Sequence, residues 1–208
     1  MSPRPYRLGQ RQKATEQTRA RILVATRELL LTSDAFSGFS IDAVARQADV
    51  ARMTVYHQFG SKIGLLEALS DSLAAHGGME QLANAFRQPD PLKALDEFIT
   101  VFSRFWQSDR LVARRLRALS ALDPDFEKVI KARDERRRQG LHVIVLRCAE
   151  KYGKPAPEAR DEIVNILFTL LSFETFDTLA GSTQSIEEVS PLIQQLARST
   201  LALDIRSL

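Results

Sequence analysis

Apolar residues recur at three- and four-residue spacing along almost the whole chain, a pattern that predicts helices and not strands. In the N-terminal part the spacing predicts a helix from about Lys13 to Thr32, followed by two short helices within residues 40–59. Beyond these, the same spacing predicts helices over residues 61–76, 91–106, 109–122, 124–152, 158–180 and 190–204. The predicted fold class is therefore all-α, with about nine helices and no internal repeat.

Polar residues, glycines and prolines mark where these helices begin and end. Ser40 and Ser61 are suitable N-caps, because a serine hydroxyl can accept an unpaired amide of the first helical turn. Asp49 is a short polar residue that can adopt the left-handed turn conformation between the two short helices. The pair Gly77-Gly78 predicts a kink or break, after which residues 79–86 continue at a changed angle. Alanine at both glycines is expected to give a slightly more stable helix.

The two short helices predict a buried face and an outward surface of mixed chemistry. Ile41, Val44, Ala45 and Ala48 form the apolar face of the first, and Val55 and Phe59 that of the second. The outward positions of the second helix are Arg52, Met53, Thr54 and His57. Such a surface suits the major groove of DNA, where arginine pairs with guanine and a methyl group contacts thymine. The alternative is an ordinary helical hairpin within a larger bundle.

The run Thr54-Val-Tyr-His-Gln-Phe59, followed by Ser61-Lys62, favours the helix-turn-helix. It resembles the DNA-binding signature of TetR-type transcriptional regulators, and the similarity extends over roughly residues 18–69. The resemblance implies a three-helix DNA-binding domain with an N-terminal arm at residues 1–62 and a larger effector-binding and dimerisation domain at residues 63–208. It also implies that Tyr56, His57 and Lys62 touch DNA phosphates.

Two residues depart from the pattern of that family. Asp49 stands where the family usually has glycine, and Ala51 where it usually has serine or threonine. Without a capping side chain at Ala51, the start of the second helix loses about 1 kcal/mol of stability. One possible phosphate contact is lost as well.

Basic residues are concentrated in the N-terminal part of the chain. Residues 1–62 contain ten Lys and Arg against five Asp and Glu, whereas the remaining residues contain 19 against 21. A basic surplus around the motif is what phosphate binding requires. Residues 1–12 are predicted to be a mobile arm. Its arginines either reach the phosphates or the minor groove of DNA, or make no contact with it. The predicted DNA-binding residues are Ser40, Arg52, Met53, Thr54, Tyr56, His57 and Lys62.

Composition and motifs exclude several other classes of protein. The single cysteine, Cys148, excludes an internal disulfide, and the apolar runs are too short and too interrupted to span a membrane. The N-terminus lacks the apolar core of a signal peptide, so a cytoplasmic protein is expected. His76 and Glu80 have the spacing of a metal pair but lack further ligands. No catalytic constellation or phosphate loop is present, so we expect no enzyme, no metal and no cofactor.

An aromatic stripe at helical spacing lies within residues 98–106 and admits two interpretations. It is either plain core or the lining of a cavity for an apolar or aromatic small molecule. The resemblance to TetR-type regulators favours the cavity, because the larger domain of those proteins commonly binds an effector among its middle helices. The charged run at residues 131–138 is interpreted as a solvated or ion-paired face, with a second nucleic-acid patch as the alternative. Candidate ligand-binding residues are Phe98, Phe102 and Trp106, with Arg115, His142 and Glu174 as polar anchors.

The predicted helix at residues 158–180 is apolar on more than one face, which is typical of a central helix or of one that meets a partner chain. Together with the final helix it predicts a homodimer with a four-helix interface. Two-fold symmetry would match a palindromic operator. The residues expected at this interface are Phe168, Leu171, Phe173, Phe176, Leu192, Leu196 and Leu203.

These observations together predict a ligand-responsive DNA-binding transcriptional regulator that acts as a homodimer. The expected mode is repression, relieved when a small apolar or aromatic effector binds. In this scheme the helix at residues 61–76 carries the signal and Gly77-Gly78 allows it to move, unless the glycine pair merely ends the helix. The alternative function is a helical small-molecule-binding protein or an enzyme with a vestigial DNA-binding domain.

Overall fold

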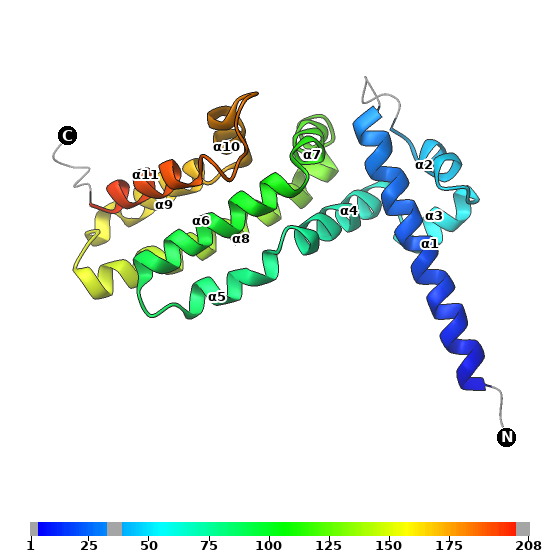
Figure 1. Ribbon diagram of the computed structural model, residues 1–208, viewed down its shortest axis with the longest axis horizontal. Helices are drawn as coiled ribbons and strands as arrows, with labels where there is room; N and C mark the ends of the chain where they lie inside the picture. The colour runs from blue at the N-terminus through cyan, green and yellow to red at the C-terminus, as the bar shows by residue number, and fades with distance from the viewer. Residues whose placement is uncertain (1–3, 33–38, 203–208) are drawn as a thin grey trace. The chain divides into compact units, whose positions relative to one another are not determined.

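The chain folds into helices joined by short turns, as the computed structural model shows for residues 4–32 and 39–202 (Figure 1). For residues 4–11 and 202 only the backbone is described. The described part contains no β-strand and eleven α-helices, with two short 3-10 helices at Met79–Gln81 and Pro157–Ala159. The α-helices are α1 Arg4–Thr32, α2 Ile41–Gln47, α3 Arg52–Phe59, α4 Lys62–His76, α5 Leu82–Arg87, α6 Pro91–Ser108, α7 Arg110–Leu122, α8 Pro124–Tyr152, α9 Arg160–Leu170, α10 Phe173–Ala180 and α11 Ser190–Ala202.

The all-α prediction is confirmed, but the described residues form eleven α-helices instead of about nine. One extra helix arises because residues 82–87 form α5, separate from α4. The other arises because the predicted helix at residues 158–180 breaks between α9 and α10. At this break Ser172 has an extended backbone, and its hydroxyl accepts a hydrogen bond from the amide of Thr175 at 3.2 Å. Ser172 is thus an N-cap within an otherwise apolar run, and it starts a new helix.

Helix α1 begins at Arg4, well before the predicted start at Lys13. Pro5 falls in its first turn, where the missing amide hydrogen of proline costs no hydrogen bond. The backbone of residues 4–12 is therefore helical, and the predicted start of the first helix at Lys13 is too late, while the mobility of these residues stays a prediction. The dimer candidate Leu203 lies outside the described residues.

The helices group into two compact units. The first contains residues 1–72 and 115–126, and the second contains residues 73–114 and 127–208. Helix α4 carries the chain from the first unit into the second, since it runs from Lys62 to His76. Apolar residues at helical spacing are buried in α1 to α4, as the pattern predicts. They include Ile22, Leu30, Ile41, Val44, Ala45, Val55, Leu65, Leu66 and Leu69.

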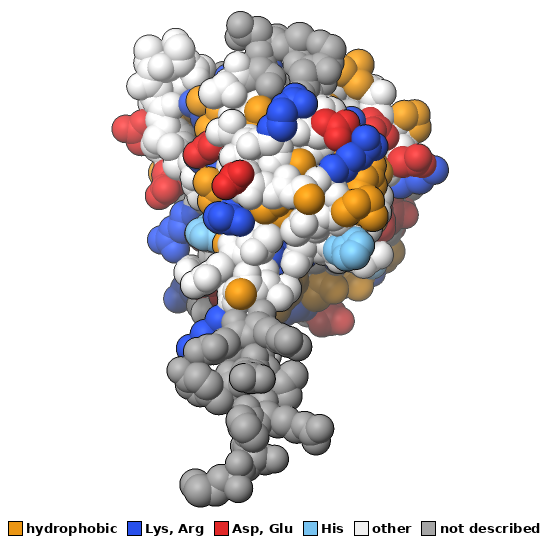
Figure 2. Space-filling view, turned by 90° about the vertical axis from the view of Figure 1, so that its right-hand side faces the viewer, with side chains coloured by type: hydrophobic (Ala, Val, Ile, Leu, Met, Phe, Trp, Pro, Cys, Tyr) orange, Lys and Arg blue, Asp and Glu red, His pale blue; other side chains and the backbone are white. Residues whose placement is uncertain are grey.

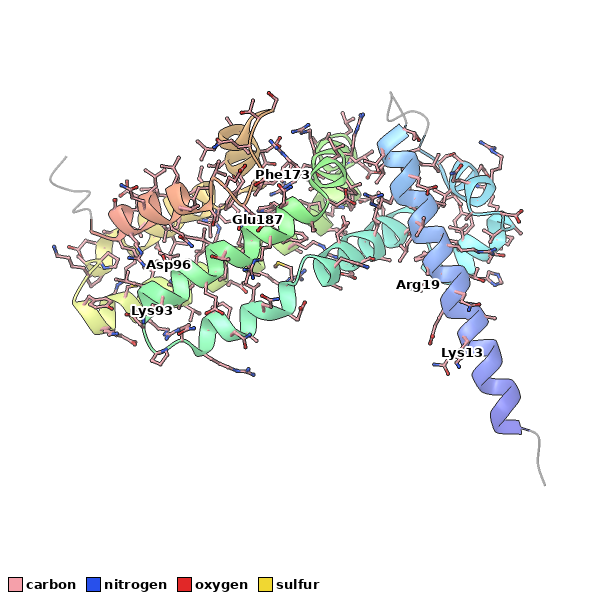
Figure 3. The ribbon with its side chains drawn as sticks, in the orientation of Figure 1. Lys13, Arg19, Lys93, Asp96, Phe173 and Glu187 are labelled. Carbon is pink, nitrogen blue, oxygen red and sulfur yellow. The ribbon has the colours of Figure 1, made fainter. Side chains whose placement is uncertain are left out.

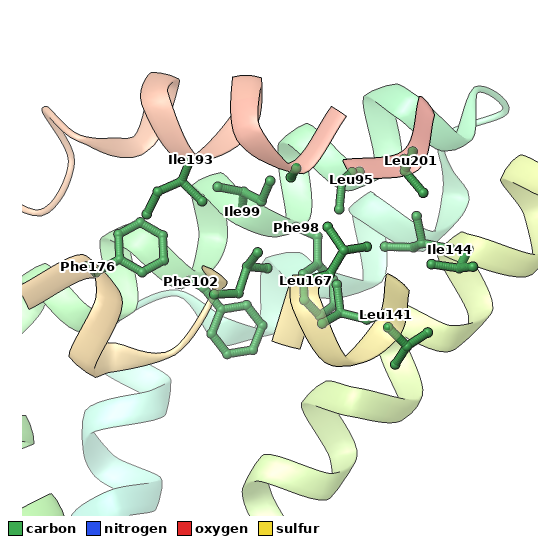
Figure 4. Packing of buried hydrophobic residues seen from close by; sticks show 14 of the residues in the cluster. Leu95, Phe98, Ile99, Phe102, Leu141, Ile144, Leu167, Phe176, Ile193 and Leu201 are labelled. Atoms are coloured by element: carbon green, nitrogen blue, oxygen red, sulfur yellow. The ribbon is translucent and has the colours of Figure 1, made fainter. Parts of the chain in front are cut away.

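The second unit is built around α6, which contacts α5, α10 and α11. Its aromatic stripe is buried in this structure: Phe98, Phe102 and Trp106 are each less than a tenth exposed. Figure 4 shows Phe98 and Phe102 within the hydrophobic cluster. The Phe98 and Phe102 ring centroids are 4.9 Å apart, and those of Trp106 and Phe173 are 5.5 Å apart. A Cβ atom on Gly140 of α8 would lie 2.9 Å from the Phe98 ring, so glycine lets α8 approach α6 closely.

The predicted break at Gly77-Gly78 is confirmed. Helix α4 ends at His76, and Gly78 has φ +76°, a conformation that glycine adopts without strain. However, a Cβ on Gly77 would lie 2.8 Å from Cα of Phe105 on α6. Alanine at position 77 would therefore push two backbones apart, and the expectation that alanines at both positions stabilise the helix is wrong.

Charged side chains connect the helices of the second unit. Arg110 donates from Nε to Oδ1 of Asp177 at 2.6 Å, and from Nη2 to the backbone oxygens of Asp177 and Gly181 at 2.9 and 2.6 Å. Arg114 donates from Nη2 to Oδ1 of Asp177 at 2.7 Å. Burial by itself would raise the pKa of Asp177, but the hydrogen bonds from Arg114 and Arg110 outweigh it and lower that pKa below its ordinary value. Across the same unit, Arg198 of α11 pairs with Asp96 of α6; Figure 3 labels Asp96.

The charged run at residues 131–138 contains a buried cation. Arg137 is 4% exposed, and its Nη2 lies 3.3 Å from Oδ1 of Asp134. Its guanidinium carbon lies 4.4 Å from the ring centroid of Phe168 and 5.8 Å from that of Phe102. The run is therefore not solvated all round. A helix seen only as a sequence does not show which of the six consecutive charged residues 133–138 its neighbours will cover.

Cys148 packs in the core of the second unit at 1% exposure. Burial raises the pKa of its thiol to about 11, so the thiol stays protonated near neutral pH. Of the helices described, none is by itself long and apolar enough to cross a membrane. The bent pair Pro157–Leu170 and Phe173–Ala180 meets that test by length and composition alone.

Candidate nucleic-acid interface

The turn between α2 and α3 is fixed by local chemistry that the sequence predicts. The Ser40 hydroxyl accepts a hydrogen bond from the amide of Ala43 at 3.2 Å, which caps α2. Asp49 has φ +50°, the left-handed conformation expected of it. Ala51 starts α3 in an extended conformation with no side-chain cap, as its missing hydroxyl predicts. These local features aim α3 so that Val55 is buried against the other helices.

With Val55 turned inward, the opposite side of α3 faces solvent. Arg52, Met53 and His57 are exposed, and Thr54 is half-buried. Met53, at 60% exposure, is one of the most exposed large apolar residues in the described chain. Figure 2 looks onto the side of the molecule that carries these helices, where basic, acidic and hydrophobic side chains are interspersed. The exposed side chains of α3 therefore offer a cation, a thioether and an imidazole to a partner.

Arg52, the first residue of α3, has two side-chain partners. Its Nη1 lies 3.3 Å from Oδ2 of Asp42 on α2, and its Nη2 donates to the hydroxyl of Tyr56 at 3.3 Å. Its guanidinium carbon also lies 5.6 Å from the centroid of the Tyr56 ring. The hydrogen bond to Tyr56, followed by the charge of Asp42, raises the pKa of Arg52 above its ordinary value. Arg52 therefore stays charged at any physiological pH.

Two further predicted DNA-binding residues are Tyr56, within α3, and Lys62, at the start of α4. Tyr56 is half-buried, and its hydroxyl still has a proton to donate while it accepts from Arg52. Lys62 begins α4, with its ammonium 5.5 Å from the centroid of the Phe39 ring. Ser61 caps the same helix, since its hydroxyl accepts from the amide of Gly64 at 3.0 Å.

Arg19 is a residue of this region that the sequence pattern did not single out. It lies on α1 (Figure 3), where its Nη1 donates to the backbone oxygen of Gln58 at 2.9 Å. Its guanidinium carbon is 4.4 Å from the centroid of the Phe59 ring. Arg19 thus satisfies a carbonyl at the C-terminal end of α3, where a cation is favourable. On a helix rich in charged residues, no local signal distinguishes it.

Two of the predicted polar anchors, His142 and Glu174, lie in the same unit as the aromatic stripe but not within it. His142 and Glu174 are exposed, so neither side chain points into the buried stripe. Arg115 belongs to the first compact unit, whereas the stripe belongs to the second. His142 instead lines a surface pocket of about 270 Å³ together with Glu135, Arg138, Gln139, Asp161, Val164 and Asn165. The charged side chain that does contact the stripe is Arg137.

The residues predicted at a dimer interface fall into two groups. Leu171, Phe173 and Phe176 are at most 2% exposed within a single chain, where they belong to the core of the second unit. Phe168 is half-buried beneath the guanidinium groups of Arg137 and Arg138. By contrast, Leu192 and Leu196 of α11 are 45% and 40% exposed. Of the described candidates, these two leucines alone present largely exposed apolar surface to a partner.

The helix-turn-helix region matches known proteins in sequence. Residues 22–69 match the family model of the bacterial regulatory proteins of the tetR family. The HTH-type transcriptional regulator AlkX of Mycobacterium tuberculosis is 43% identical over 53 residues. That alignment covers 26% of this chain and 25% of AlkX, so it concerns only part of each protein.

Solved structures resemble nearly the whole chain. PfmR, a TetR family transcriptional regulator from Thermus thermophilus, matches with a TM-score of 0.66 over 88% of this chain and 97% of its own, at 20% identity. NalD, the secondary repressor of the MexAB-OprM multidrug efflux pump in Pseudomonas aeruginosa, matches with a TM-score of 0.65 over 92% and 99%, at 18% identity. At these identities the likeness establishes the fold. Residues 22–69 therefore carry the helix-turn-helix of the tetR family of bacterial regulatory proteins, and the chain as a whole shares the fold of the solved TetR-type structures.

Proposed function

We propose that this protein represses transcription as a homodimer bound to a palindromic operator, and that a small apolar or aromatic effector releases it. The observation that carries the proposal is the exposed surface of α3, where Arg52, Met53 and His57 face solvent beside the half-buried Tyr56. Such a surface on the second helix of a helix-turn-helix suits the major groove. Its DNA target places the protein in the cytoplasm. We propose residues 1–62 as the DNA-binding part and residues 63–208 as the effector and dimerisation part.

Binding to the DNA that flanks the protein's own gene tests the proposal most directly. Arg52→Ala should cost about 1–3 kcal/mol of binding free energy and relax preference at one base-pair position. Lys62→Ala should weaken binding to all sequences and reduce the salt dependence by about one unit. Lys93→Ala, an exposed lysine of α6, is the matched control and should change neither. If Arg52→Ala and Lys62→Ala both bind like the wild type, the interface is not the one described. A reporter gene behind the bound DNA distinguishes repression from activation.

The proposed dimer surface centres on α11, because Leu192 and Leu196 lie one helical turn apart and are both largely exposed. Leu196→Glu should give monomers in sedimentation at micromolar concentration. Gln195→Glu, which adds the same charge at a neighbouring exposed position, should leave the dimer intact. Phe173→Glu is unsuitable for this test, because Phe173 is 2% exposed and its replacement would unfold the chain. A wild-type mass equal to that of one chain would contradict the dimer.

The proposed effector binds at the aromatic stripe, which must open to admit it. Trp106 is the only tryptophan in the sequence and is 8% exposed within the stripe. Its fluorescence therefore reports on this site alone. Compounds from an apolar and aromatic panel that release the protein from DNA should also change Trp106 emission. A compound that releases DNA without changing the emission, and that binds Phe102→Ala as tightly as wild type, would place the effector elsewhere.

We further propose that α4 transmits the effector signal and that Gly78 permits its movement. A coupling of about 1–3 kcal/mol would change operator affinity roughly 5–150-fold. Gly78→Ala should reduce this coupling, because φ +76° is strained for alanine and the hinge would be altered. Gly153→Ala introduces the same strain at φ +71° beyond the end of α8 and should leave the coupling unchanged. Equal coupling in the two variants would assign Gly78 a role in ending α4 only.

A further inference from the structure

Asp42 is an acidic residue placed beside the side chain proposed to contact bases. It lies in the first turn of α2, and its Oδ2 is 3.3 Å from Nη1 of Arg52 at the start of α3. The ion pair therefore spans the helix-turn-helix between its two helices. An acid near a DNA-binding surface is unfavourable for phosphate attraction, so its position there calls for a physical account.

A contribution to folding stability does not explain why Asp42 lies beside Arg52. Both side chains are about half exposed, 57% for Arg52 and 49% for Asp42. Ion pairs as exposed as this one contribute little to stability. Asp42 does suit the N-terminal turn of α2, where a carboxylate is favourable, but that role requires no contact with Arg52.

The position of Asp42 is better explained by its holding the guanidinium of Arg52 in one orientation. Asp42 holds Nη1 while the Tyr56 hydroxyl accepts from Nη2, so the planar group is fixed from two sides. A free arginine samples many rotamers and loses that freedom on binding, whereas a held one loses less. The guanidinium has more N–H groups than these two contacts use, and enough remain for a bidentate contact with guanine.

The negative charge of Asp42 also favours specific over non-specific binding. A carboxylate near the DNA surface repels phosphates of every sequence equally, which lowers non-specific affinity. Where Arg52 meets a guanine, the held guanidinium offsets that repulsion. Asp42 would therefore widen the ratio between specific and non-specific binding, which is the quantity that matters among many competing sites.

We infer that Asp42 is a specificity-determining residue, which holds Arg52 for bidentate recognition of a guanine and disfavours binding where that guanine is absent. The inference rests on the proposed DNA-binding function. In this scheme Asp42 does not contact DNA itself and acts by positioning Arg52. The Tyr56 hydroxyl makes two contacts, because it accepts from Arg52 and donates its own proton to a phosphate.

Selection from a pool of duplexes with a randomised centre provides the test. The wild-type protein defines the preferred sequence, and Arg52→Ala identifies the base pair whose preference depends on Arg52. Asp42→Asn, Asp42→Glu and the double variant Asp42→Asn/Arg52→Ala are then titrated with the selected duplex, with a duplex altered at that base pair, and with a scrambled duplex. Urea unfolding of each variant verifies that the fold is retained.

Asp42→Asn should reduce discrimination at the Arg52-dependent base pair by roughly 5-fold or more, the lower end for a bidentate contact. It should at the same time bind the scrambled duplex more tightly, because a negative charge is gone. Asp42→Glu keeps the charge but displaces the carboxylate, so it should lose discrimination while its scrambled-duplex affinity stays at the wild-type level. In the Arg52→Ala background, Asp42→Asn should have no further effect on discrimination.

Three results would overturn the inference. One is an unchanged preference profile in Asp42→Asn. Another is an equal gain of affinity for all three duplexes, which would mean that Asp42 only repels phosphate. The third is a preference that depends on Asp42 even without Arg52, which would mean that Asp42 itself accepts a hydrogen bond from a cytosine. A wild-type protein that enriches no sequence would instead refute the proposed function, and this inference with it.

Discussion

In the helix-turn-helix, the side chain of Arg52 is 57% exposed and meets the similarly exposed Asp42. In the larger unit, the side chain of Arg110 is 18% exposed and binds the carboxylate of Asp177 together with three backbone oxygens. Arg147 likewise donates to the backbone oxygens of Phe86 and Gln88. The same residue type therefore faces outward in one region and joins helices in the other.

This difference shows which arginines are available to a partner. A guanidinium that already satisfies several carbonyl oxygens is costly to remove, because those oxygens would be left without donors. Replacing Arg110 should therefore lower stability, whereas replacing Arg52 should lower DNA affinity with little effect on stability. Four substitutions test this difference. The first three lower stability, DNA affinity or both, depending on the region in which they lie. The fourth should raise both in the helix-turn-helix.

Phe98→Ala should have the largest effect, a loss of about 3–5 kcal/mol in the free energy of unfolding. Phe98 is 1% exposed and contacts the rings of Phe86 and Phe102. Urea unfolding followed by circular dichroism measures the loss. Phe86→Ala is the matched control and should cost clearly less, because Phe86 is 37% exposed. Equal losses would mean that the stripe is not packed as the structure shows.

Asp177→Asn should cost about 2 kcal/mol near neutral pH, since Arg110 and Arg114 lose a charged acceptor. The pKa of Asp177 is lowered in the folded state, so its contribution is complete above the pKa of the unfolded carboxyl, near 3.8, and is lost as pH falls through the lowered value. The stability gap between wild type and variant should therefore be constant from pH 7 to about 5 and shrink below about 4. Asp161→Asn, an exposed residue of α9, should stay within about 0.5 kcal/mol. A gap independent of pH would contradict the ion-pair assignment.

The two regions also differ in how far the sequence predicts them. In the helix-turn-helix, Ser40, Asp49 and Ser61 act on amides and backbone angles within a few residues of themselves. Their roles can be recognised without knowing the rest of the fold, and all three are confirmed. The buried positions of α2 and α3 follow from spacing alone for the same reason.

In the larger unit, the decisive contacts join residues far apart in the chain. Arg110 meets Asp177 across α7 and α10, and Gly77 is limited by Phe105 on α6. Burial of Arg137 depends on which side of α8 meets Phe168. No local pattern encodes these contacts, so helix number, the effect of alanine at Gly77 and the polar neighbour of the stripe were not predicted. The roles proposed for residues that contact DNA and effector remain predictions.

Arg19→Ala tests an arginine of the helix-turn-helix region that joins two helices through a backbone oxygen, as Arg110 does. Loss of its hydrogen bond to Gln58 and its stacking on Phe59 should lower stability by about 1–2 kcal/mol. Because it holds the C-terminal end of α3, DNA affinity should fall as well. Arg21→Ala, an exposed position of α1, should leave stability within about 0.5 kcal/mol. Arg19→Lys should restore part of the loss, since it keeps a donor near the carbonyl. A variant that loses affinity at unchanged stability would instead make Arg19 a DNA contact.

Ala51→Ser should produce the smallest change, a gain of about 0.5–1 kcal/mol in the free energy of unfolding. Ala51 already has the extended backbone of an N-cap, φ −68° and ψ 145°, and its carbonyl accepts from the amide of Thr54 at 2.8 Å. A serine hydroxyl at that position can accept a first-turn amide without moving the backbone, and it can also donate to a phosphate. Affinity should therefore rise for the selected and the scrambled duplex alike, because a phosphate contact carries no sequence information. Ala51→Val, which adds bulk without a hydroxyl, should give neither gain. If Ala51→Ser raised affinity only for the selected duplex, the start of α3 would contact a base and not the backbone of the DNA.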